Sequence, residues 1–175
     1  GLGVPRPRMH VALGGTFDPV HDGHRALFER AFELGDVTVG LTTDDLASET
    51  RHVDRYVRSF EDRRRDLVSE VATVAEAHDR EFEVRPLKAP TGIATEPGFD
   101  ALVVSPETRD GGERINEIRR ERGLDPLAIE VVGHVIAADD ERISSTRIVR
   151  GEIDRHGNLT PDRDGRGPEE PPVDG

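Results

Sequence analysis

The chain has 175 residues and a formal net charge of -12 at pH 7, from 36 acidic against 24 basic residues, and it contains no cysteine. A chain of this length predicts one domain whose hydrophobic core needs neither a disulfide nor a structural metal. The acidic balance argues against a nucleic-acid partner. Without a long apolar run or a basic leader, we expect a cytoplasmic protein that has no membrane partner.

The basic residues are almost all arginines, because Lys88 is the only lysine. An acidic, lysine-poor chain with few aromatic residues is typical either of partial disorder or of adaptation to concentrated salt, where self-repulsion is screened. The clear strand patterns favour the second interpretation, so we expect a halophilic source. The run Arg63-Arg64-Arg65 is interpreted as a solvated helix face rather than as a nucleic-acid contact.

The first predicted strand covers 9–13 and leads directly into the segment GGTFDPVHDGH, residues 14–24. A helix is expected over 25–34, because its apolar residues recur at helical spacing. The segment 14–24 therefore ends a buried strand and begins a helix.

Such a junction attracts anions, because its free backbone N–H groups and the positive end of the helix dipole face the same space. Gly14 and Gly15 let the backbone approach a phosphate, and Thr16 adds a hydroxyl donor. His21 and His24 flank the first helical turn, where both imidazoles can reach one phosphate. Glycines and a histidine are also common in ordinary turns, but the position directly after a strand favours a phosphate site.

The later elements alternate between strands and helices. Strands alternating with helices predict an α/β fold, here a Rossmann-like, doubly wound, mostly parallel five-stranded sheet with helices on both faces. Ligands of such sheets bind beyond the carboxyl ends of the strands, so Thr42-Thr43 and 105–108 are expected to wall the same cleft. The predicted strands cover 37–42, 81–87, 100–104 and 127–132, the helices cover 60–78 and 112–122, and 88–99 is expected to be a loop.

The segment ISSTRI at 143–148 is the second candidate phosphate site. Serine and threonine in such a run are most often a helix cap, a role that is compatible with phosphate binding. The proline-rich, acidic residues after it are expected to form a disordered tail. We therefore expect an N-terminal extension over 1–8, a domain over 9–155 and a disordered tail over 156–175.

These motifs resemble those of a known superfamily. GTFDP at 15–19 followed by HxGH at 21–24 is similar to the signature of the HxGH-type nucleotidyltransferases, and 143–148 is similar to their C-terminal signature. The stretches VVSPET (103–108), INEIR (115–119) and RIVRGEI (147–153) resemble the archaeal and eukaryotic phosphopantetheine adenylyltransferases. The resemblance covers roughly 9–159.

The resemblance implies an enzyme that transfers the adenylyl group of ATP to 4'-phosphopantetheine, in coenzyme A biosynthesis, without a covalent enzyme intermediate. It implies that Mg²⁺ bridges the nucleotide and is not held by a cage of protein ligands. It further implies His24 as the main stabiliser of the transition state and His21 as its assistant, Gly15, Thr16 and Phe17 at the phosphates with Thr16 between both substrates, and Ser144, Ser145, Thr146 and Arg147 at the β- and γ-phosphates of ATP.

One departure concerns a lysine that many family members carry in the loop after the second strand. The corresponding loop here has none, and Arg51 is the nearest substitute in the phosphopantetheine site. Arg55 and Arg58 are further candidates, although each can also be interpreted as a solvated surface charge. Asp18 is expected to orient the backbone of its motif rather than to approach a metal.

Other ionisable residues receive no role, because a lone histidine outside a motif is usually a surface or packing residue, and acidic loops are usually solvated. They are His10, His52, His78, His134 and His156, and Asp139, Asp140 and Glu141.

Two alternatives remain open at this point. Other nucleotidyltransferases of this superfamily share the phosphate site and use nicotinamide mononucleotide, FMN or a polyol phosphate as the acceptor. A non-catalytic sensor of adenine nucleotides could keep the fold, although the presence of both His21 and His24 argues against it.

Overall fold

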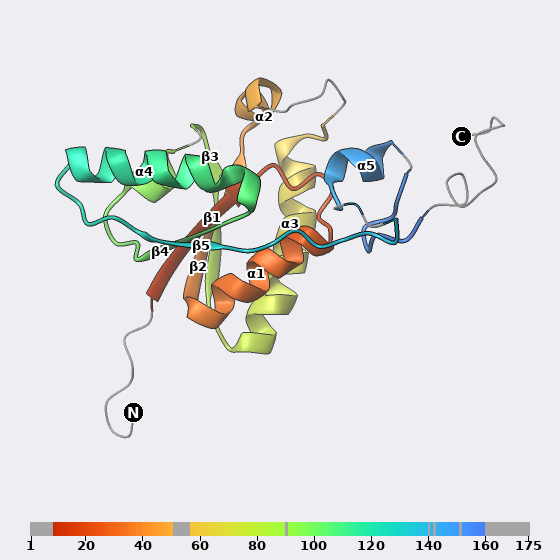
Figure 1. The fold of residues 1–175 in the computed structure, drawn as a ribbon, viewed down its shortest axis with the longest axis horizontal. Helices are drawn as coiled ribbons and strands as arrows, with labels where there is room; N and C mark the ends of the chain where they lie inside the picture. Colours follow the sequence, from red (N-terminus) through yellow and green to blue (C-terminus); the bar gives the residue numbers. More distant parts are fainter. Residues whose placement is uncertain are drawn as a thin grey trace.

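The structure, a computed structural model, describes residues 9–50, 57–89, 91–139, 141, 143–150 and 152–159. Within this part of the chain, all the strands pair in parallel to form one sheet in the order β3-β2-β1-β4-β5 (Figure 1). The order reverses between β1 and β4, as expected for a doubly wound fold. The strands are β1 (Met9–Gly15), β2 (Gly35–Thr42), β3 (Phe82–Leu87), β4 (Ala101–Val104) and β5 (Ala128–Val131).

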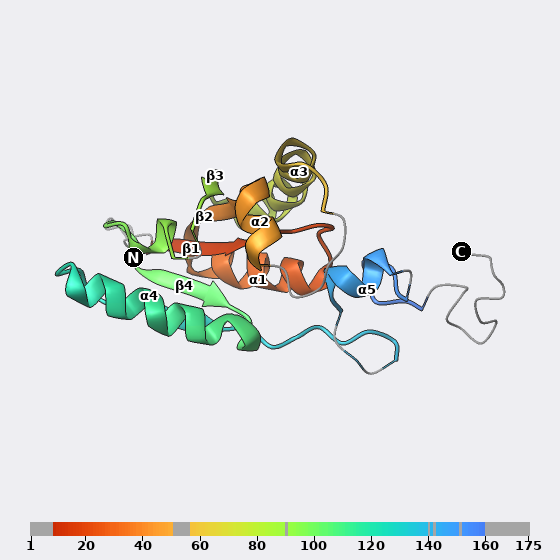
Figure 2. The same ribbon diagram turned by 90° about the horizontal axis from the view of Figure 1, so that it is seen from above.

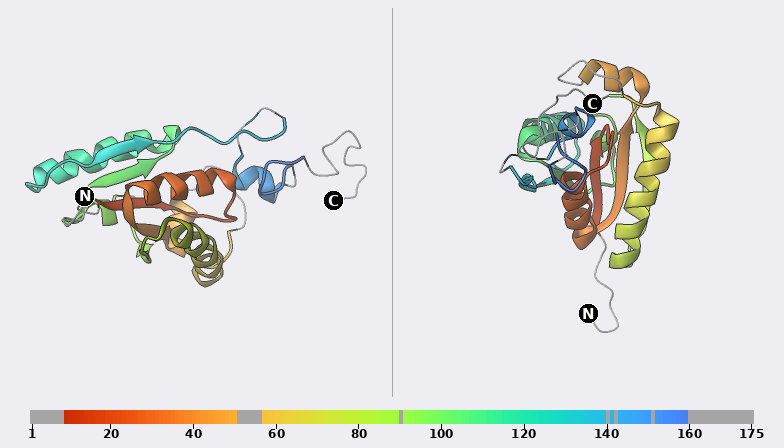
Figure 3. Two further views of the ribbon diagram at one scale, coloured as in Figure 1. Left: turned by 90° about the horizontal axis from the view of Figure 1, so that it is seen from below. Right: turned by 90° about the vertical axis from the view of Figure 1, so that its right-hand side faces the viewer.

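Helices cover both faces of the sheet (Figures 2 and 3). One face packs against α1 and α3, which also contact each other, and the other face packs against α4 and the short turn η1. This arrangement confirms the α/β fold predicted from the alternating strands and helices. The helices are α1 (Asp22–Leu34), α2 (Asp44–Thr50), α3 (Phe60–His78), α4 (Arg109–Glu121) and α5 (Ser145–Val149), with 3-10 turns η1 (Ile93–Thr95) and η2 (Pro106–Thr108).

The core consists of two layers, because successive side chains of a strand point to opposite faces. In β1, Val11 and Leu13 pack toward α1 and α3, whereas Ala12 packs toward α4. In β4, Val103 joins the first layer and Leu102 the second. The nearly continuous apolar strands of the sequence therefore reflect burial on both faces, as parallel sheets require.

Helix α2 was not expected, since residues 44–50 were interpreted as part of a loop. Two acidic residues, Asp44 and Asp45, stand in its first turn, where they complement the helix dipole. The Thr43 hydroxyl accepts a hydrogen bond from the Leu46 backbone N–H at 3.3 Å. These local signals were present in the sequence, but they belong to a helix of seven residues, too short to show apolar periodicity.

The C-terminal segment forms a small lobe beyond the carboxyl ends of the strands, beside the start of α1 (Figure 2). Its own apolar cluster contains Ile143 and Ile153, with Leu159 packed against it. Ile153 and Leu159 also form an antiparallel bridge. The predicted domain end at residue 155 is therefore too early, because 156–159 belong to the fold; the extension over 1–8 and the remainder of the expected tail lie outside the described residues.

Among the described helices, none combines the length and the apolar character needed to cross a bilayer.

Candidate active site

A cavity of about 530 Å³ opens at the carboxyl edge of the sheet, where the strand order reverses. Most of its lining residues come from four segments that are far apart in the sequence. They are Gly14–His24 at the junction of β1 and α1, Ser105–Thr108 after β4, Val132–Val135 after β5, and Glu141–Arg150 of the C-terminal lobe. The structure thus brings both signature motifs to one cavity, as the sequence predicts.

Phe17 shapes the loop that follows β1. Its backbone has a φ of 52°, a left-handed conformation that a bulky residue rarely adopts. Its ring is 2 % exposed and contacts the edge of His24, with ring centroids 4.8 Å apart. Burial of this ring holds the backbone of Gly15, Thr16 and Phe17 against the cavity. The sequence signal for this loop conformation was the phenylalanine itself, which stands among glycines and polar residues.

The two histidines of the HxGH motif are held by the backbone of their own turn. The Gly23 N–H donates to Nδ1 of His21 at 3.0 Å, and the His21 N–H donates to Nδ1 of His24 at 3.3 Å. Because each Nδ1 accepts a hydrogen bond, each neutral ring carries its proton on Nε2. The rings are stacked, with centroids 3.8 Å apart. The motif therefore presents two imidazole Nε2–H donors.

Burial, and secondly the neighbouring His21, hold the pKa of His24 well below its ordinary value of 6.5. His24 is therefore neutral at pH 7, and its Nε2–H carries no positive charge. Gly23 is required between the histidines, because a Cβ at this position would lie 2.8 Å from Cε1 of His21. Gly23 thus leaves the space between the two rings open.

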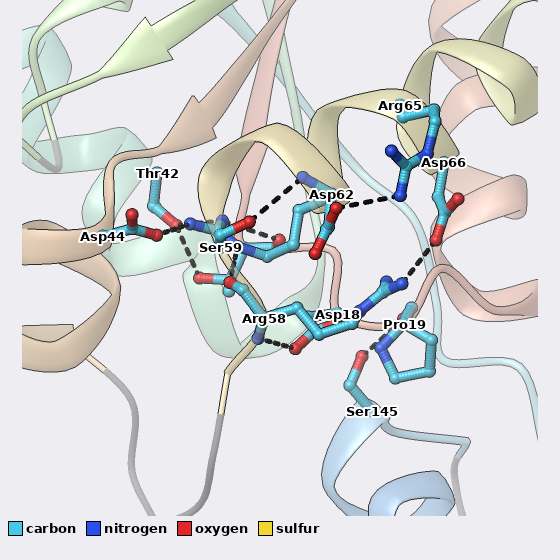
Figure 4. A network of polar contacts seen from close by, with 12 residues as sticks. Asp18, Pro19, Thr42, Asp44, Arg58, Ser59, Asp62, Arg65, Asp66 and Ser145 are labelled. Atoms are coloured by element: carbon cyan, nitrogen blue, oxygen red, sulfur yellow. Dashed lines mark hydrogen bonds and ion pairs between the residues drawn. The ribbon is translucent and has the colours of Figure 1, made fainter.

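Asp18 is buried and joins its motif to the segment just before α3. It accepts hydrogen bonds from the backbone N–H and from Nε of Arg58, at 2.9 and 2.6 Å (Figure 4). Arg58 also pairs with Asp66 at 2.6 Å. Arg58 is therefore neither a solvated surface charge nor a lining cation that could replace the family's lysine. Arg51 and Arg55, the other candidates for that role, lie outside the described residues.

Arg63 corrects the interpretation of the run 63–65. Its side chain is fully buried, whereas Arg64 and Arg65 are exposed. Arg63 points inward because it lies four residues before Leu67 and eight before Val71, on the buried face of α3. The solvated-face interpretation is therefore wrong for Arg63, and its contacts are described below.

The ISSTRI motif is confirmed as a helix cap. The Ser144 hydroxyl accepts the Arg147 N–H at 3.2 Å, and the Ser145 hydroxyl donates to the Pro19 carbonyl at 2.8 Å (Figure 4). Arg147 pairs with Glu152 at 3.0 Å and with Asp139. Asp139 is thus an ion-pair partner rather than a solvated loop residue. The side chain of Thr146 lies outside the described part of the structure.

Two basic residues of the cavity wall were missed by sequence reasoning. Arg150 is exposed there and has no ion-pair partner among the residues that the structure describes. His134, which received no role, is also exposed in the wall. The available signal for His134 was its place directly after the fifth strand, at the carboxyl edge of the sheet. Thr42, predicted to wall the cleft, instead lies behind Thr16, at 2.9 Å between the hydroxyl oxygens.

Within the residues that the structure describes, no group of three or more histidine, aspartate or glutamate residues is arranged to hold a metal ion.

Comparisons with known proteins agree with this geometry. Residues 12–151 match the model of the family described as cytidylyltransferase-like. The phosphopantetheine adenylyltransferase of Methanosarcina acetivorans is 43% identical over 152 residues, which cover 85% of this chain and 94% of the relative. The phosphopantetheine adenylyltransferase of Archaeoglobus fulgidus is 40% identical over 153 residues, covering 86% of this chain and 99% of the relative.

Solved structures are similar as well. A protein of unknown function from Archaeoglobus fulgidus superposes with a TM-score of 0.63 at 33% identity, covering 78% of this chain and 100% of that one. A putative nicotinate-nucleotide adenylyltransferase from Vibrio parahaemolyticus superposes with a TM-score of 0.52 at 12% identity, covering 86% and 83%. The second likeness shows a shared fold only.

Proposed function

The chain belongs to the cytidylyltransferase-like family and, within it, to the phosphopantetheine adenylyltransferases, and from this premise we propose that it transfers the adenylyl group of ATP to 4'-phosphopantetheine. The products are dephospho-coenzyme A and pyrophosphate. The observation that carries the proposal is the one cavity that is lined both by His21 and His24, whose Nδ1 atoms accept backbone hydrogen bonds, and by residues of the ISSTRI segment. A cavity of about 530 Å³ is within the usual range for small-molecule sites.

The reaction joins two anions. A phosphate oxygen of 4'-phosphopantetheine attacks the α-phosphorus of ATP, the new P–O bond forms, and the bond to the β-phosphate oxygen breaks as pyrophosphate leaves. Such chemistry depends on in-line positioning and on donors aimed at the developing charge. We assign the main donor role to Nε2–H of His24, with His21 assisting.

A neutral donor suits this position. In a partly buried wall, a hydrogen bond to a developing negative charge is stronger than in water. The bond from the His21 N–H to Nδ1 fixes the ring of His24 before substrate arrives. The donor is therefore preorganised, and it does not require a proton from solution.

The remaining phosphate contacts are assigned to the loop after β1 and to the C-terminal lobe. The backbone of Gly15, Thr16 and Phe17 contacts the reacting phosphates, and the hydroxyl of Thr16 lies between the two substrates. The β- and γ-phosphates are held by the ISSTRI segment, with Arg150 as an added cation. These assignments are supported by the position of each group in the cavity wall, which contains Gly15, Thr16, Phe17, Ser144, Ser145, Arg147 and Arg150.

Mg²⁺ is proposed to arrive with ATP and to be held mainly by the phosphates and water. Asp18, a carboxylate of the motif that lines the cavity, already accepts two hydrogen bonds from Arg58. The donor chemistry of the described wall thus fits a nucleotide-borne ion better than a cage of carboxylates. When bound, the ion neutralises part of the charge of the triphosphate.

A cytoplasmic location is proposed because ATP, the adenylyl donor, is a cytoplasmic metabolite. Adaptation to high salt is proposed from the net charge of -12 and the single lysine. Thermal unfolding in low and in molar KCl tests the second proposal. A midpoint that does not rise with salt would count against it.

The function is tested by pyrophosphate release from ATP and Mg²⁺ in high salt, with 4'-phosphopantetheine, nicotinamide mononucleotide, FMN or glycerol 3-phosphate as the acceptor. Release that is selective for 4'-phosphopantetheine is the expected result. Release with another acceptor would change the substrate but keep the site. Binding of ATP without release from any acceptor would contradict the enzyme and favour a nucleotide sensor.

A further inference from the structure

Arg63 is a fully buried cation behind the cavity wall. Its Nε donates to the Arg58 carbonyl at 2.8 Å, and its Nη2 donates to Asp44 Oδ1 at 3.0 Å. Its Nη1 donates to the carbonyl of Thr16 at 3.2 Å and to the hydroxyl of Thr42 at 3.3 Å. A guanidinium keeps its charge even when buried, so such a position is tolerated only where acceptors surround it. Three of these partners, Arg58, Thr42 and Asp44, are labelled in Figure 4.

Two of these acceptors belong to the site or touch it. The carbonyl of Thr16 is part of the loop that lines the cavity, and the hydroxyl of Thr42 lies 2.9 Å from the hydroxyl of Thr16. Arg63, Thr42 and Thr16 therefore form one chain of contacts that runs from the interior of α3 to the cavity.

The direction of this chain follows from the number of protons. A threonine hydroxyl has one proton to donate and two lone pairs that accept, and arginine can only donate. Thr42 is 6 % exposed. If it accepted from Thr16 as well as from Arg63, its own buried proton would have no acceptor among the described residues. Buried polar groups are rarely left without a hydrogen-bond partner. We therefore infer that Thr42 donates to Thr16.

The positive charge of Arg63 also favours donation from Thr42 to Thr16. A charged donor on the oxygen of Thr42 polarises its O–H bond and strengthens the hydrogen bond that this hydroxyl donates. The hydroxyl oxygen of Thr16 then accepts the hydrogen bond from Thr42. The proton of the Thr16 hydroxyl is therefore available to donate into the cavity. Thr16 becomes a donor of fixed orientation rather than a freely rotating hydroxyl.

We propose that Arg63 and Thr42 are positioning residues, which hold Thr16 as a hydrogen-bond donor to a phosphate oxygen of the bound substrate. The proposal rests on the adenylyl transfer proposed above, since that reaction supplies the phosphate. Arg63 also fixes the backbone of Thr16 through its carbonyl. The same cation thus sets both the place of Thr16 and the direction of its proton.

We call the chain of contacts from Arg63 through Thr42 to Thr16 the relay. A double-mutant cycle on the two threonines tests it. The variants Thr42→Val, Thr16→Val and the double variant keep side-chain volume and remove the hydroxyls. Each is assayed for kcat/KM of pyrophosphate release, with thermal unfolding measured in parallel. Thr73→Val is the matched control, because Thr73 is an exposed residue of α3 whose hydroxyl donates to the Ser69 carbonyl of its own helix.

The expected result is a loss of about tenfold or more in kcat/KM for Thr42→Val, the size expected for one hydrogen bond to a charged group. The double variant is expected to be no slower than Thr16→Val alone, because Thr42 acts only through Thr16. Thr42→Ser is expected to restore most of the rate, and Thr73→Val to keep it. Losses that add in the double variant, or a Thr42→Val enzyme with the wild-type rate, would overturn the relay.

The cycle remains decisive if the proposed function fails. If the wild type releases pyrophosphate with none of the four acceptors, the same four proteins are compared by calorimetry for their Kd for ATP, where the same non-additive pattern is expected. Additive changes in Kd would overturn the relay independently of the reaction. Arg63→Lys, which keeps the charge but loses the fork of donors, is expected to resemble Thr42→Val in rate wherever it folds.

Discussion

The groups that we propose to bind phosphate are held by different means in the loop after β1 and in the C-terminal lobe. The junction of β1 and α1 rests on the main core, and its donors are neutral imidazoles and backbone N–H groups. The C-terminal lobe rests on a small apolar cluster of its own, and Arg147 in it pairs with carboxylates of the same lobe. A rigid wall with uncharged donors suits the reacting phosphate, whereas a charged and more loosely supported wall suits the phosphates that leave.

The largest effect is expected at the rigid wall. His24→Ala should lower kcat by about a hundredfold or more, while the Kd for ATP changes little, because the donor acts mainly on the transition state. Pyrophosphate release and calorimetry measure the two quantities. The control is His78→Ala, which alters a histidine paired with Glu29 away from the cavity. A loss confined to ATP affinity would contradict the role given to His24.

The supporting cluster of the lobe can be disturbed at Gly157. This residue has a φ of 85°, and a Cβ here would lie 2.8 Å from Ile143 Cδ1 and 2.9 Å from Ala137 Cα. Gly157→Ala is expected to cost about 1–3 kcal/mol of local stability. The Kd for ATP should rise while the main thermal transition moves little, if the lobe is a separate unit. The matched control is Gly111→Ala, in the first turn of α4, where a Cβ meets nothing within 4 Å.

The neutral state of His24 has a consequence for stability against pH. Its folded pKa is below 6.5, so below that pH the unfolded chain binds a proton that the folded chain does not. The free energy of unfolding should therefore fall as the pH decreases from 6.5 toward the folded pKa, with a slope of at most about 1.4 kcal/mol per pH unit. Denaturation of the wild type and of His24→Gln as a function of pH measures this slope of the free energy of unfolding. Equal slopes would contradict the assignment.

The smallest expected effect concerns the direct tie between the walls. Ser145→Ala removes the hydrogen bond to the Pro19 carbonyl and should raise the Kd for ATP severalfold, corresponding to about 1 kcal/mol. Titration calorimetry measures this change, and the kcat at saturating ATP should stay close to that of the wild type. A large fall in kcat would mean that the lobe also orients the reacting phosphate.

The sequence predicts the sheet, helix α3 and the two motifs well, because those depend on local patterns. Strands buried on both faces give apolar runs, and α3 shows regular apolar spacing from Leu67 onward. The motif at 14–24 could be placed because its glycines and histidines follow a strand directly. The shared cavity could be predicted because parallel strands end at one edge.

Other features depend on contacts between distant segments. Arg63 looks like Arg64 and Arg65 in the sequence, and only its register with Leu67 distinguishes it. Arg150 and His134 have no pattern of their own, and they enter the wall because the chain returns across the strand ends. The pairing of Arg58 with Asp18 joins residues 40 positions apart, which no local spacing encodes.

The return of the chain end to α1 also affects how the protein is made. The Asp22 N–H donates to the Arg155 carbonyl at 3.0 Å, and His156 pairs with Asp22 at 3.0 Å, so the start of α1 contacts the last described segment. During synthesis on the ribosome, the first four strands can pair long before residue 155 emerges. A nascent chain can therefore acquire its sheet early, but it completes the proposed nucleotide site only after residue 155 has emerged.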